Sequence, residues 1–289
     1  MPQSLVEKWI LHRLNQTAQQ LNQDMLQRSF MSATSCVYNF WLYDLCDVYI
    51  EAIKPITDAG ADPSARLSAQ HTLYACLDAG LKLLHPFMPF VTEELWHRLP
   101  QRPQETAETI AHARFPEWQA VHDFGKEAAH FDDVFATVRA VRGLAADYGL
   151  TSQIQAFVEV PNNEYRAVLE SQCSVMHTLI KGCEKIVCVP AASDVPPGCV
   201  VASVSSSIQV HLLVSGLVDF DQELSKLAKK LTLNETQLQR TTALTQKPDW
   251  SKTPEDVRAH TQKRLDDLEA EKAALLQAQA NFDKLRSSA

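Results

Sequence analysis

Glycine is scarce in this sequence, with 8 residues in 289. Folds that bind dinucleotides or nucleoside triphosphates cluster glycines at a phosphate turn, but neither GxGxxG nor GxxxxGKS/T occurs in the chain. These two types of nucleotide site are therefore excluded. The longest apolar runs are far too short to span a membrane, so no transmembrane helix is expected.

The chain also lacks paired cysteines of the CxxC type, which excludes the common zinc-binding pattern. No signal peptide is evident, and an odd number of cysteines is typical of reduced thiols in a cytosolic protein, so we expect a cytoplasmic location. The seven cysteines are Cys36, Cys46, Cys76, Cys173, Cys183, Cys188 and Cys199.

The chain also has no excess of positive charge. The formal net charge is −8, which argues against a protein that binds nucleic acid over its whole surface. The charge is uneven, however, because all the excess acid lies before residue 219 and the remainder is neutral, with 12 basic and 12 acidic residues. A local basic surface in that last part can still act, since fields are largely screened beyond about 8 Å.

Helical periodicity dominates the first 84 residues. Apolar residues recur every three or four positions, which predicts helices over 4–24, 29–54 and 62–84. Proline 55 is expected to end the second helix. The expected N-terminal caps are Ser4 with Glu7 as a capping box, Ser29, and Asp62 followed by Pro63.

Residues 85–96, HPFMPFVTEELW, predict a sharp corner between two helices. Pro86 disfavours the α conformation at His85 and ends one helix, and Pro89 suits the first turn of the next. The aromatic residues of the corner are expected in the core, with Trp96 packing the second helix into the bundle. A stripe facing the core is expected from Val91, Leu95 and Leu99.

The pattern changes after a helix predicted over about 127–148. Residues 153–160 alternate like a strand, 164–180 look helical, 185–189 form a short β-branched run, and 199–204 with 208–214 indicate a hairpin. From Leu217 the apolar residues follow a heptad period, interrupted by Pro248 and Pro254. Two arms of about 25–30 residues in an antiparallel coiled-coil hairpin are predicted, each roughly 40 Å long.

Three of these features resemble one enzyme family. HPFMPFVTEELW is similar to the P-F-x-P-x-x-x-E-x-L/W corner in the anticodon-binding helical domain of class I aminoacyl-tRNA synthetases for branched aliphatic amino acids. FWLYDLCDVYIEAIKP, residues 40–55, and the turn KPDWSKTPEDV, residues 247–257, resemble valyl-tRNA synthetases of the eukaryotic cytosolic type. The resemblance covers essentially the whole chain and matches the C-terminal third of such an enzyme.

The resemblance implies a mainly α fold in three parts: an anticodon-binding helical bundle over 1–122, a connecting helix with a small α+β module over 123–216, and a coiled-coil tRNA-binding arm over 217–289. The family's catalytic domain holds ATP with H-x-G-H and K-M-S-K-S signatures, and neither occurs here. The whole enzyme would use ATP and Mg²⁺ to attach valine to its tRNA. We therefore expect no cofactor, no metal and no adenylate chemistry in this chain alone.

The expected partners are a valine-specific tRNA, the catalytic body of the synthetase and, by resemblance, the translation elongation factor 1 complex. A second interpretation stays open, in which the chain is a non-catalytic scaffold for RNA or protein derived from the synthetase. An acidic stripe of Asp44, Asp47 and Glu51 is either a solvated face or a docking surface for the catalytic body.

The candidate tRNA contacts are of three kinds. Exposed aromatic residues of the bundle can stack on unpaired bases, which favours Trp41 and Tyr43. Arg139 and Arg142 can form surface ion pairs or contact phosphates, although the family pattern has a third arginine where this chain has Ala145. The basic residues of the first arm can contact phosphates or serve as a solvated flank; they are Lys226, Lys229, Lys230 and Arg240.

Overall fold

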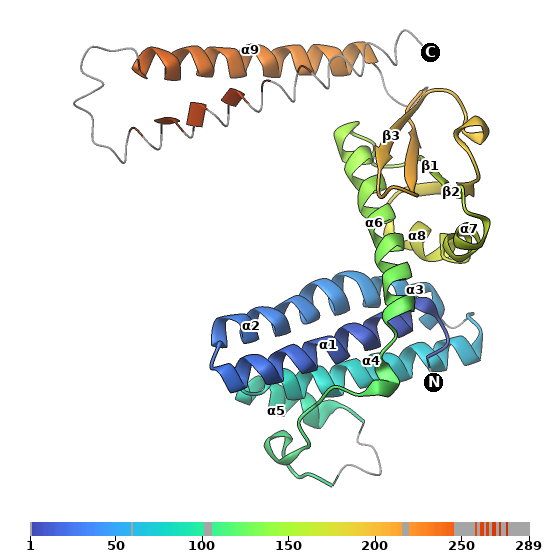
Figure 1. The fold of residues 1–289 in the computed structure, drawn as a ribbon, viewed down its shortest axis with the longest axis vertical. Coiled ribbons are helices and arrows are strands. Elements are labelled where there is room, and N and C mark those ends of the chain that lie inside the picture. Colours follow the sequence, from blue (N-terminus) through green and yellow to red (C-terminus); the bar gives the residue numbers. More distant parts are fainter. Residues whose placement is uncertain are drawn as a thin grey trace.

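The structure is a computed structural model of the 289-residue chain. It describes residues 2–58, 60–100, 106–215 and 220–245, together with single helical positions between 258 and 276. Figure 1 shows a bundle of helices at the N-terminal end, a small sheet with its own helices, and a long separate helix, α9. The mainly α fold with a small mixed α+β part confirms the predicted class.

The bundle contains four long helical stretches joined by short turns. A long helix, α1, lies between the others and contacts α2 and α4 (Figure 1). The bounds are α1 Leu5–Gln27, α2 Phe30–Asn39, η1 Phe40–Ile50, α3 Glu51–Thr57, α4 Pro63–Leu84 and α5 Pro89–Arg98.

Two of the three predicted caps are confirmed. Ser4 Oγ accepts a hydrogen bond from the Glu7 amide at 3.3 Å, and the Glu7 carboxylate accepts one from the Ser4 amide at 3.4 Å. The Asp62 carboxylate accepts a bond from the Ala65 amide at 2.8 Å. The Ser29 cap is wrong, since its side chain makes no capping bond. Arg28 instead adopts a left-handed conformation, and its amide bonds back to α1, which leaves a tight turn into α2.

The second predicted helix is continuous but not a plain α-helix. Its central part, η1, is a π-helix of 11 residues. The wider turn places pairs of adjacent residues, such as Asp44 with Leu45 and Val48 with Tyr49, on the buried side. Proline 55 does not end the helix as predicted, because it lies inside α3 and the helix runs on to Thr57.

Residues 106–122 are irregular apart from two short turns, Ile110–His112 (η2) and Ala120–His122 (η3). The following helix, α6 (Gly125–Asp147), leads to a four-stranded sheet in the order β2-β1-β4-β3. Strands β1 and β2 are parallel, and the β3–β4 hairpin is antiparallel as predicted. The bounds are β1 Ile154–Glu159, β2 Cys183–Val189, β3 Cys199–Ser203 and β4 Gln209–Leu213.

The crossover between the parallel strands differs from the prediction. Instead of one helix over 164–180, two short helices, α7 (Asn163–Glu170) and α8 (Cys173–Leu179), form with a break at 171–172. Asn162 caps α7 by accepting a hydrogen bond from the Tyr165 amide at 2.9 Å. Both helices pack on β2, whereas α6 packs on β3 and β4.

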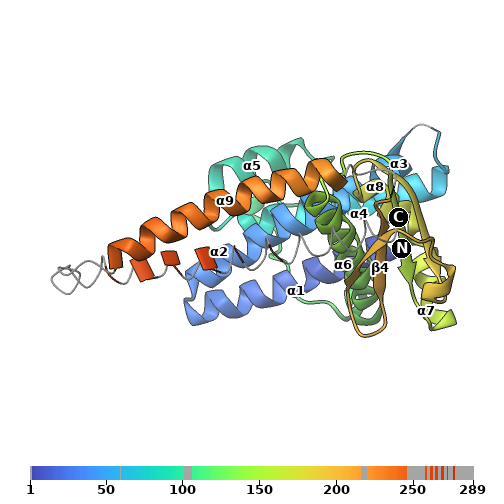
Figure 2. The same cartoon turned by 90° about the horizontal axis from the view of Figure 1, so that it is seen from above.

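Helix α6 joins the bundle to the sheet (Figures 1 and 2). On the bundle side, the Trp9 and Phe131 rings lie 4.9 Å apart, the Trp9 indole donates to Asp132 at 2.9 Å, and Lys8 pairs with Glu127 at 3.1 Å. On the other side, α6 contacts the sheet. One continuous apolar core therefore runs from Val6 to Val214, while the predicted limits of the three parts stay predictions.

The last described helix, α9 (Phe220–Thr245), lies apart from the bundle (Figure 1). Asn234 donates to the Leu268 carbonyl at 3.3 Å, Lys272 pairs with Glu235 at 2.8 Å, and Leu265 and Leu268 are buried. These contacts show a second helical segment against α9. The predicted turn over 247–257 lies outside the described residues, as does Leu217, where the heptad period begins, so the coiled-coil hairpin stays a prediction. Among the described helices, none is long and apolar enough to cross a membrane.

Candidate nucleic-acid interface

The two prolines mark the helix ends as predicted, but the expected effect of Pro86 on His85 is wrong. His85 keeps an α conformation, with φ −54° and ψ −40°, because its amide still bonds to the Leu81 carbonyl at 2.9 Å. Helix α4 ends at Leu84 and α5 begins at Pro89. The imidazole of His85 lies 2.7 Å from Thr92 Oγ1, and that hydroxyl donates to the Met88 carbonyl at 2.9 Å. His85 therefore ties the end of α4 to the first turn of α5.

Trp96 fixes α5 to α4. Its side chain is buried, its indole donates to Asp78 at 2.9 Å, and Lys82 lies over its ring at 5.7 Å and pairs with the same carboxylate at 3.1 Å. The expected stripe of Val91, Leu95 and Leu99 is wrong for its first two members. Val91 and Leu95 are exposed, because the inner face of α5 is formed by Thr92 and Trp96, whereas Leu99 is half-buried against the Trp96 cluster.

The expectation that all corner aromatics are core residues is also corrected. Phe90 is 91% exposed, whereas Phe87 is half-buried against the core. Since α5 turns Thr92 and Trp96 inward, the first turn of the helix directs Phe90 to the surface. The corner therefore presents apolar side chains on the outside of the bundle.

A groove of about 580 Å³ lies between α2 and this corner. Its lining combines aromatic and apolar side chains with small polar ones, the composition that unpaired bases require for stacking and hydrogen bonding. Tyr38 is 57% exposed, and its ring meets the ring of Tyr43 edge-on, with centroids 6.0 Å apart. The lining residues are Thr34, Ser35, Tyr38, Asn39, Trp41, Leu84, Phe87 and Met88.

The two aromatic residues singled out from the sequence have different positions. Tyr43 is exposed beside the groove. Trp41 is half-buried, and its indole donates to the Gly80 carbonyl at 3.3 Å, so it forms a wall of the groove instead of a free platform. Tyr38 was missed by the sequence reasoning, although its spacing of five from Tyr43 indicates a common face once the helix is a π-helix.

Gly80 supports the Trp41 wall by leaving room for its ring. A Cβ at Gly80 would lie 3.0 Å from the Trp41 ring and 3.3 Å from the buried Phe40 ring. We expect Gly80→Ala to lower the free energy of unfolding by about 1–3 kcal/mol, because crowding two packed rings outweighs the better helix propensity of alanine. Chemical denaturation of the full chain measures this change.

Gly143 is the matched control, since it lies within α6 and a methyl group added there would meet nothing within 4 Å. Gly143→Ala should raise the free energy of unfolding by about 0.5–1 kcal/mol. Equal effects of the two substitutions, whatever their sign, would show that packing against Trp41 does not govern position 80.

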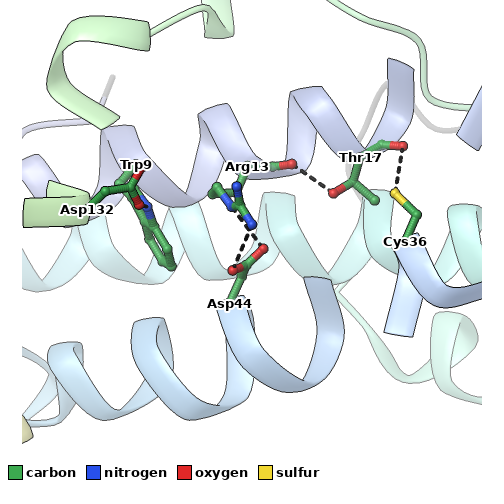
Figure 3. A network of polar contacts seen from close by, with 6 residues as sticks. All are labelled: Trp9, Arg13, Thr17, Cys36, Asp44 and Asp132. Atoms are coloured by element: carbon green, nitrogen blue, oxygen red, sulfur yellow. Dashed lines mark hydrogen bonds and ion pairs between the residues drawn. The ribbon is translucent and has the colours of Figure 1, made fainter. Parts of the chain in front are cut away.

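The acidic stripe predicted on the second helix is only partly a surface. Asp44 is buried and accepts two hydrogen bonds from Arg13, from Nε at 3.0 Å and from a terminal nitrogen at 3.3 Å (Figure 3). Burial raises the pKa of Asp44, and the arginine opposes that shift. Figure 3 shows that this pair joins α1 to η1 beside the Trp9–Asp132 bond. Of the other two residues, Asp47 is exposed and Glu51 pairs with Lys54 at 2.6 Å.

Arg139 and Arg142 are both exposed on α6. Within the described ranges neither forms an ion pair, and the Arg139 guanidinium lies over the Phe135 ring at 5.1 Å. Ala145, at the position of the family's third arginine, is buried, so an arginine there would need a different local packing. Phosphate contact by the two arginines stays a prediction.

Of the four basic residues predicted on the arm, Lys229 and Arg240 are exposed on α9. The side chains of Lys226 and Lys230 lie outside the described part, although both positions are helical. The structure does not bring these residues together with the groove of the bundle in one site.

Comparison with known proteins identifies the family to which the bundle belongs. The family model of the anticodon-binding domain of tRNA ligases matches residues 7–160, more than half of the chain. The chain belongs to this tRNA ligase family. That match includes most of α1, the groove, the corner, all of α6 and strand β1.

The relatives with similar sequences are named valine–tRNA ligases. The chain is 42% identical over 229 residues to the mitochondrial valine–tRNA ligase of Saccharomyces cerevisiae, in a match that covers 79% of this chain and 21% of that protein. It is 37% identical to the valine–tRNA ligase of Homo sapiens over 98% of this chain and 22% of that protein. These matches confirm the resemblance to the C-terminal region of valyl-tRNA synthetase. The chain spans about a fifth of the length of these relatives, less than the expected third.

Proposed function

We propose that this chain is the tRNA-binding portion of a valine–tRNA ligase and that the groove between α2 and the proline corner receives unpaired bases of the anticodon loop. The observation that carries the proposal is the position of this groove, lined by Tyr38, Trp41 and Phe87, inside the region matched by the anticodon-binding domain. Stacking on such rings contributes about 1–3 kcal/mol for each base.

The charge distribution supports the same division of labour. Acidic excess over the first three quarters of the chain disfavours nonspecific phosphate binding by the bundle, so contacts there would be mainly to bases. Exposed basic residues on α6 and α9, including Arg139, Arg142 and Lys229, can supply phosphate contacts beyond the groove. The arm would form the predicted coiled-coil hairpin.

The chemistry of the whole enzyme would take place elsewhere. The H-x-G-H and K-M-S-K-S signatures that hold ATP in the family do not occur in this sequence. The catalytic body would therefore be the partner that activates valine. A cytoplasmic location and an association with translation elongation factor 1 belong to the same proposal, as expectations from the resemblance.

Substitution of Tyr38 tests the groove. Tyr38→Ala should weaken binding of a valine tRNA transcript by about 5- to 150-fold, the equivalent of one lost stacking interaction. A transcript whose anticodon loop is replaced by a stable tetraloop should bind the wild type and the variant equally. Filter binding with the full chain measures both affinities, and unfolding curves confirm that the variant is folded.

Trp118→Ala is the control, because Trp118 is an exposed aromatic residue outside the groove. It should change neither affinity. If Tyr38→Ala weakens both transcripts equally, or neither, bases of the anticodon loop do not occupy the groove. Failure of the wild type to bind either transcript would favour the interpretation as a scaffold without tRNA binding.

A further inference from the structure

Three of the seven cysteines gather between α8 and the sheet. Cys173 begins α8, while Cys183 and Cys188 belong to β2. Cys183 and Cys188 are five residues apart, which in a regular strand would place them on opposite faces. The register shift between Ile154 and Gln155 of β1 changes this, because it leaves Glu184 as the extra residue of a bulge.

The bulge places both strand cysteines on the side of the sheet that the helices cover. Cys183 pairs with Ile154 and Cys188 with Val158, and both partners belong to the buried core. Cys173 is half-buried above them, and its sulfur lies 3.9 Å from that of Cys188. The described residues include all seven cysteines, and no other two of their sulfurs are in contact.

The pKa values of the two thiols are shifted in opposite directions. The hydrogen bond shared with Cys188 lowers the pKa of the Cys173 thiol, against the effects of burial and of Glu170. The same bond, followed by burial, raises the pKa of Cys188. Cys173 is therefore the more easily ionised and the more exposed of the two thiols, and thiolates are the forms that react with oxidants.

We propose that Cys173 and Cys188 form an intramolecular disulfide when the protein meets a hydroperoxide. The contact of the two sulfurs across α8 and β2 carries the proposal. A disulfide requires sulfurs about 2.05 Å apart. The first residue of α8 follows the irregular residues 171–172, so rotation of the Cys173 side chain with a small movement of that turn closes the remaining distance.

The reaction balances with hydrogen peroxide as the oxidant. The Cys173 thiolate attacks one peroxide oxygen, the O–O bond breaks, and hydroxide leaves with the electron pair and takes up the proton that the thiol lost. The resulting sulfenic acid, Cys173–SOH, is attacked by the sulfur of Cys188. The S–O bond then breaks, a disulfide forms and a second water is released. Two thiols are oxidised and one peroxide is reduced to two waters.

The consequence reaches beyond the sheet, since α8 also contacts α3 of the bundle. A covalent bond between α8 and β2 would hold in place α8, which besides α6 connects the bundle to the sheet region. Oxidation would thus stiffen an existing contact without creating a new one.

Peptide mapping after oxidation of the reduced full chain tests the proposal. Trypsin separates the three cysteines into the peptides 167–181, 182–185 and 186–226. After one equivalent of hydrogen peroxide and alkylation, we expect a cross-link between 167–181 and 186–226, at least about tenfold more abundant than any other pairing. Two of the seven alkylatable thiols should be lost and recovered with dithiothreitol.

Matched variants identify the partner. Cys183→Ser and Cys199→Ser should leave the cross-link intact, and the second also excludes Cys199, which shares a peptide with Cys188. Cys188→Ser should abolish it and let Cys173 sulfenic acid accumulate, trapped by dimedone. In urea the preference for Cys188 should disappear. A link to Cys183, a covalent dimer, or oxidation of Cys173 to sulfinic acid without a link in the folded wild type would each overturn the proposal.

Discussion

Trp96→Ala should destabilise the protein by about 3–5 kcal/mol, the range for removal of a large buried aromatic side chain. The side chain is 4% exposed and belongs to a small apolar cluster with Leu81 and Ile110. Its loss would open a cavity between α4 and α5 and remove the indole donor to Asp78. This is a large part of the roughly 5–15 kcal/mol by which a typical domain is stable.

Two further variants separate the contributions. Trp96→Phe keeps most of the ring but loses the N–H group, so it should cost clearly less than alanine. Trp118→Ala, at an exposed position, should cost less than about 1 kcal/mol. Urea denaturation curves of the three variants give the free energies, and a melting curve that Trp96→Ala leaves unchanged would contradict the observed packing of the corner.

Neutralising three lysines of α9 should weaken tRNA binding without changing its selectivity. Positions 226, 229 and 230 share one side of a helix by their spacing, and no aromatic residue occurs between Leu224 and Leu244 that could stack on a base. Lysine acts as a point charge toward phosphate with little demand on geometry. Lys226→Gln, Lys229→Gln and Lys230→Gln together should weaken valine tRNA and a non-cognate tRNA by similar factors, on the order of tenfold or more at low salt.

Salt titration provides the decisive measurement. The slope of log affinity against log salt should become shallower by about 0.7–0.9 for each lost phosphate contact. A matched control replaces three exposed lysines of α6 and the sheet region, Lys126, Lys181 and Lys185, with glutamine, which changes the net charge equally. If only the valine tRNA loses affinity, the arm reads identity; if both triple variants behave alike, the effect is one of overall charge.

Local signals predicted the helix ends wherever a single residue decides them. The Ser4–Glu7 box, the Asp62 cap and the prolines of the corner act within a few residues, so the sequence pattern was sufficient. The cap predicted at Ser29 is wrong because the turn into α2 is made by the left-handed Arg28, and the Ser29 side chain makes no capping bond. The end predicted at Pro55 is wrong because a proline removes a single backbone bond and the helix continues to Thr57.

The candidate site was harder to predict because it depends on packing between elements. Periodicity assigns an apolar residue to a helix, but it does not decide which of two adjacent faces turns inward, so Phe90 was placed in the core and Tyr38 was overlooked. The π-helix has no distinctive composition, and it is what buries Asp44 opposite Arg13. Sequence motifs indicated the family, whereas the groove required the relative position of α2 and the proline corner.

Helix α6 sets the distance between the bundle and the sheet. Its 23 residues span about 34 Å and contribute side chains to the packing of both the bundle and the sheet. Because both regions pack on the same continuous helix, the distance between their surfaces is set before a ligand binds. When one end engages a ligand of matching length, the second contact loses little further entropy, and two modest interactions add to a tight one.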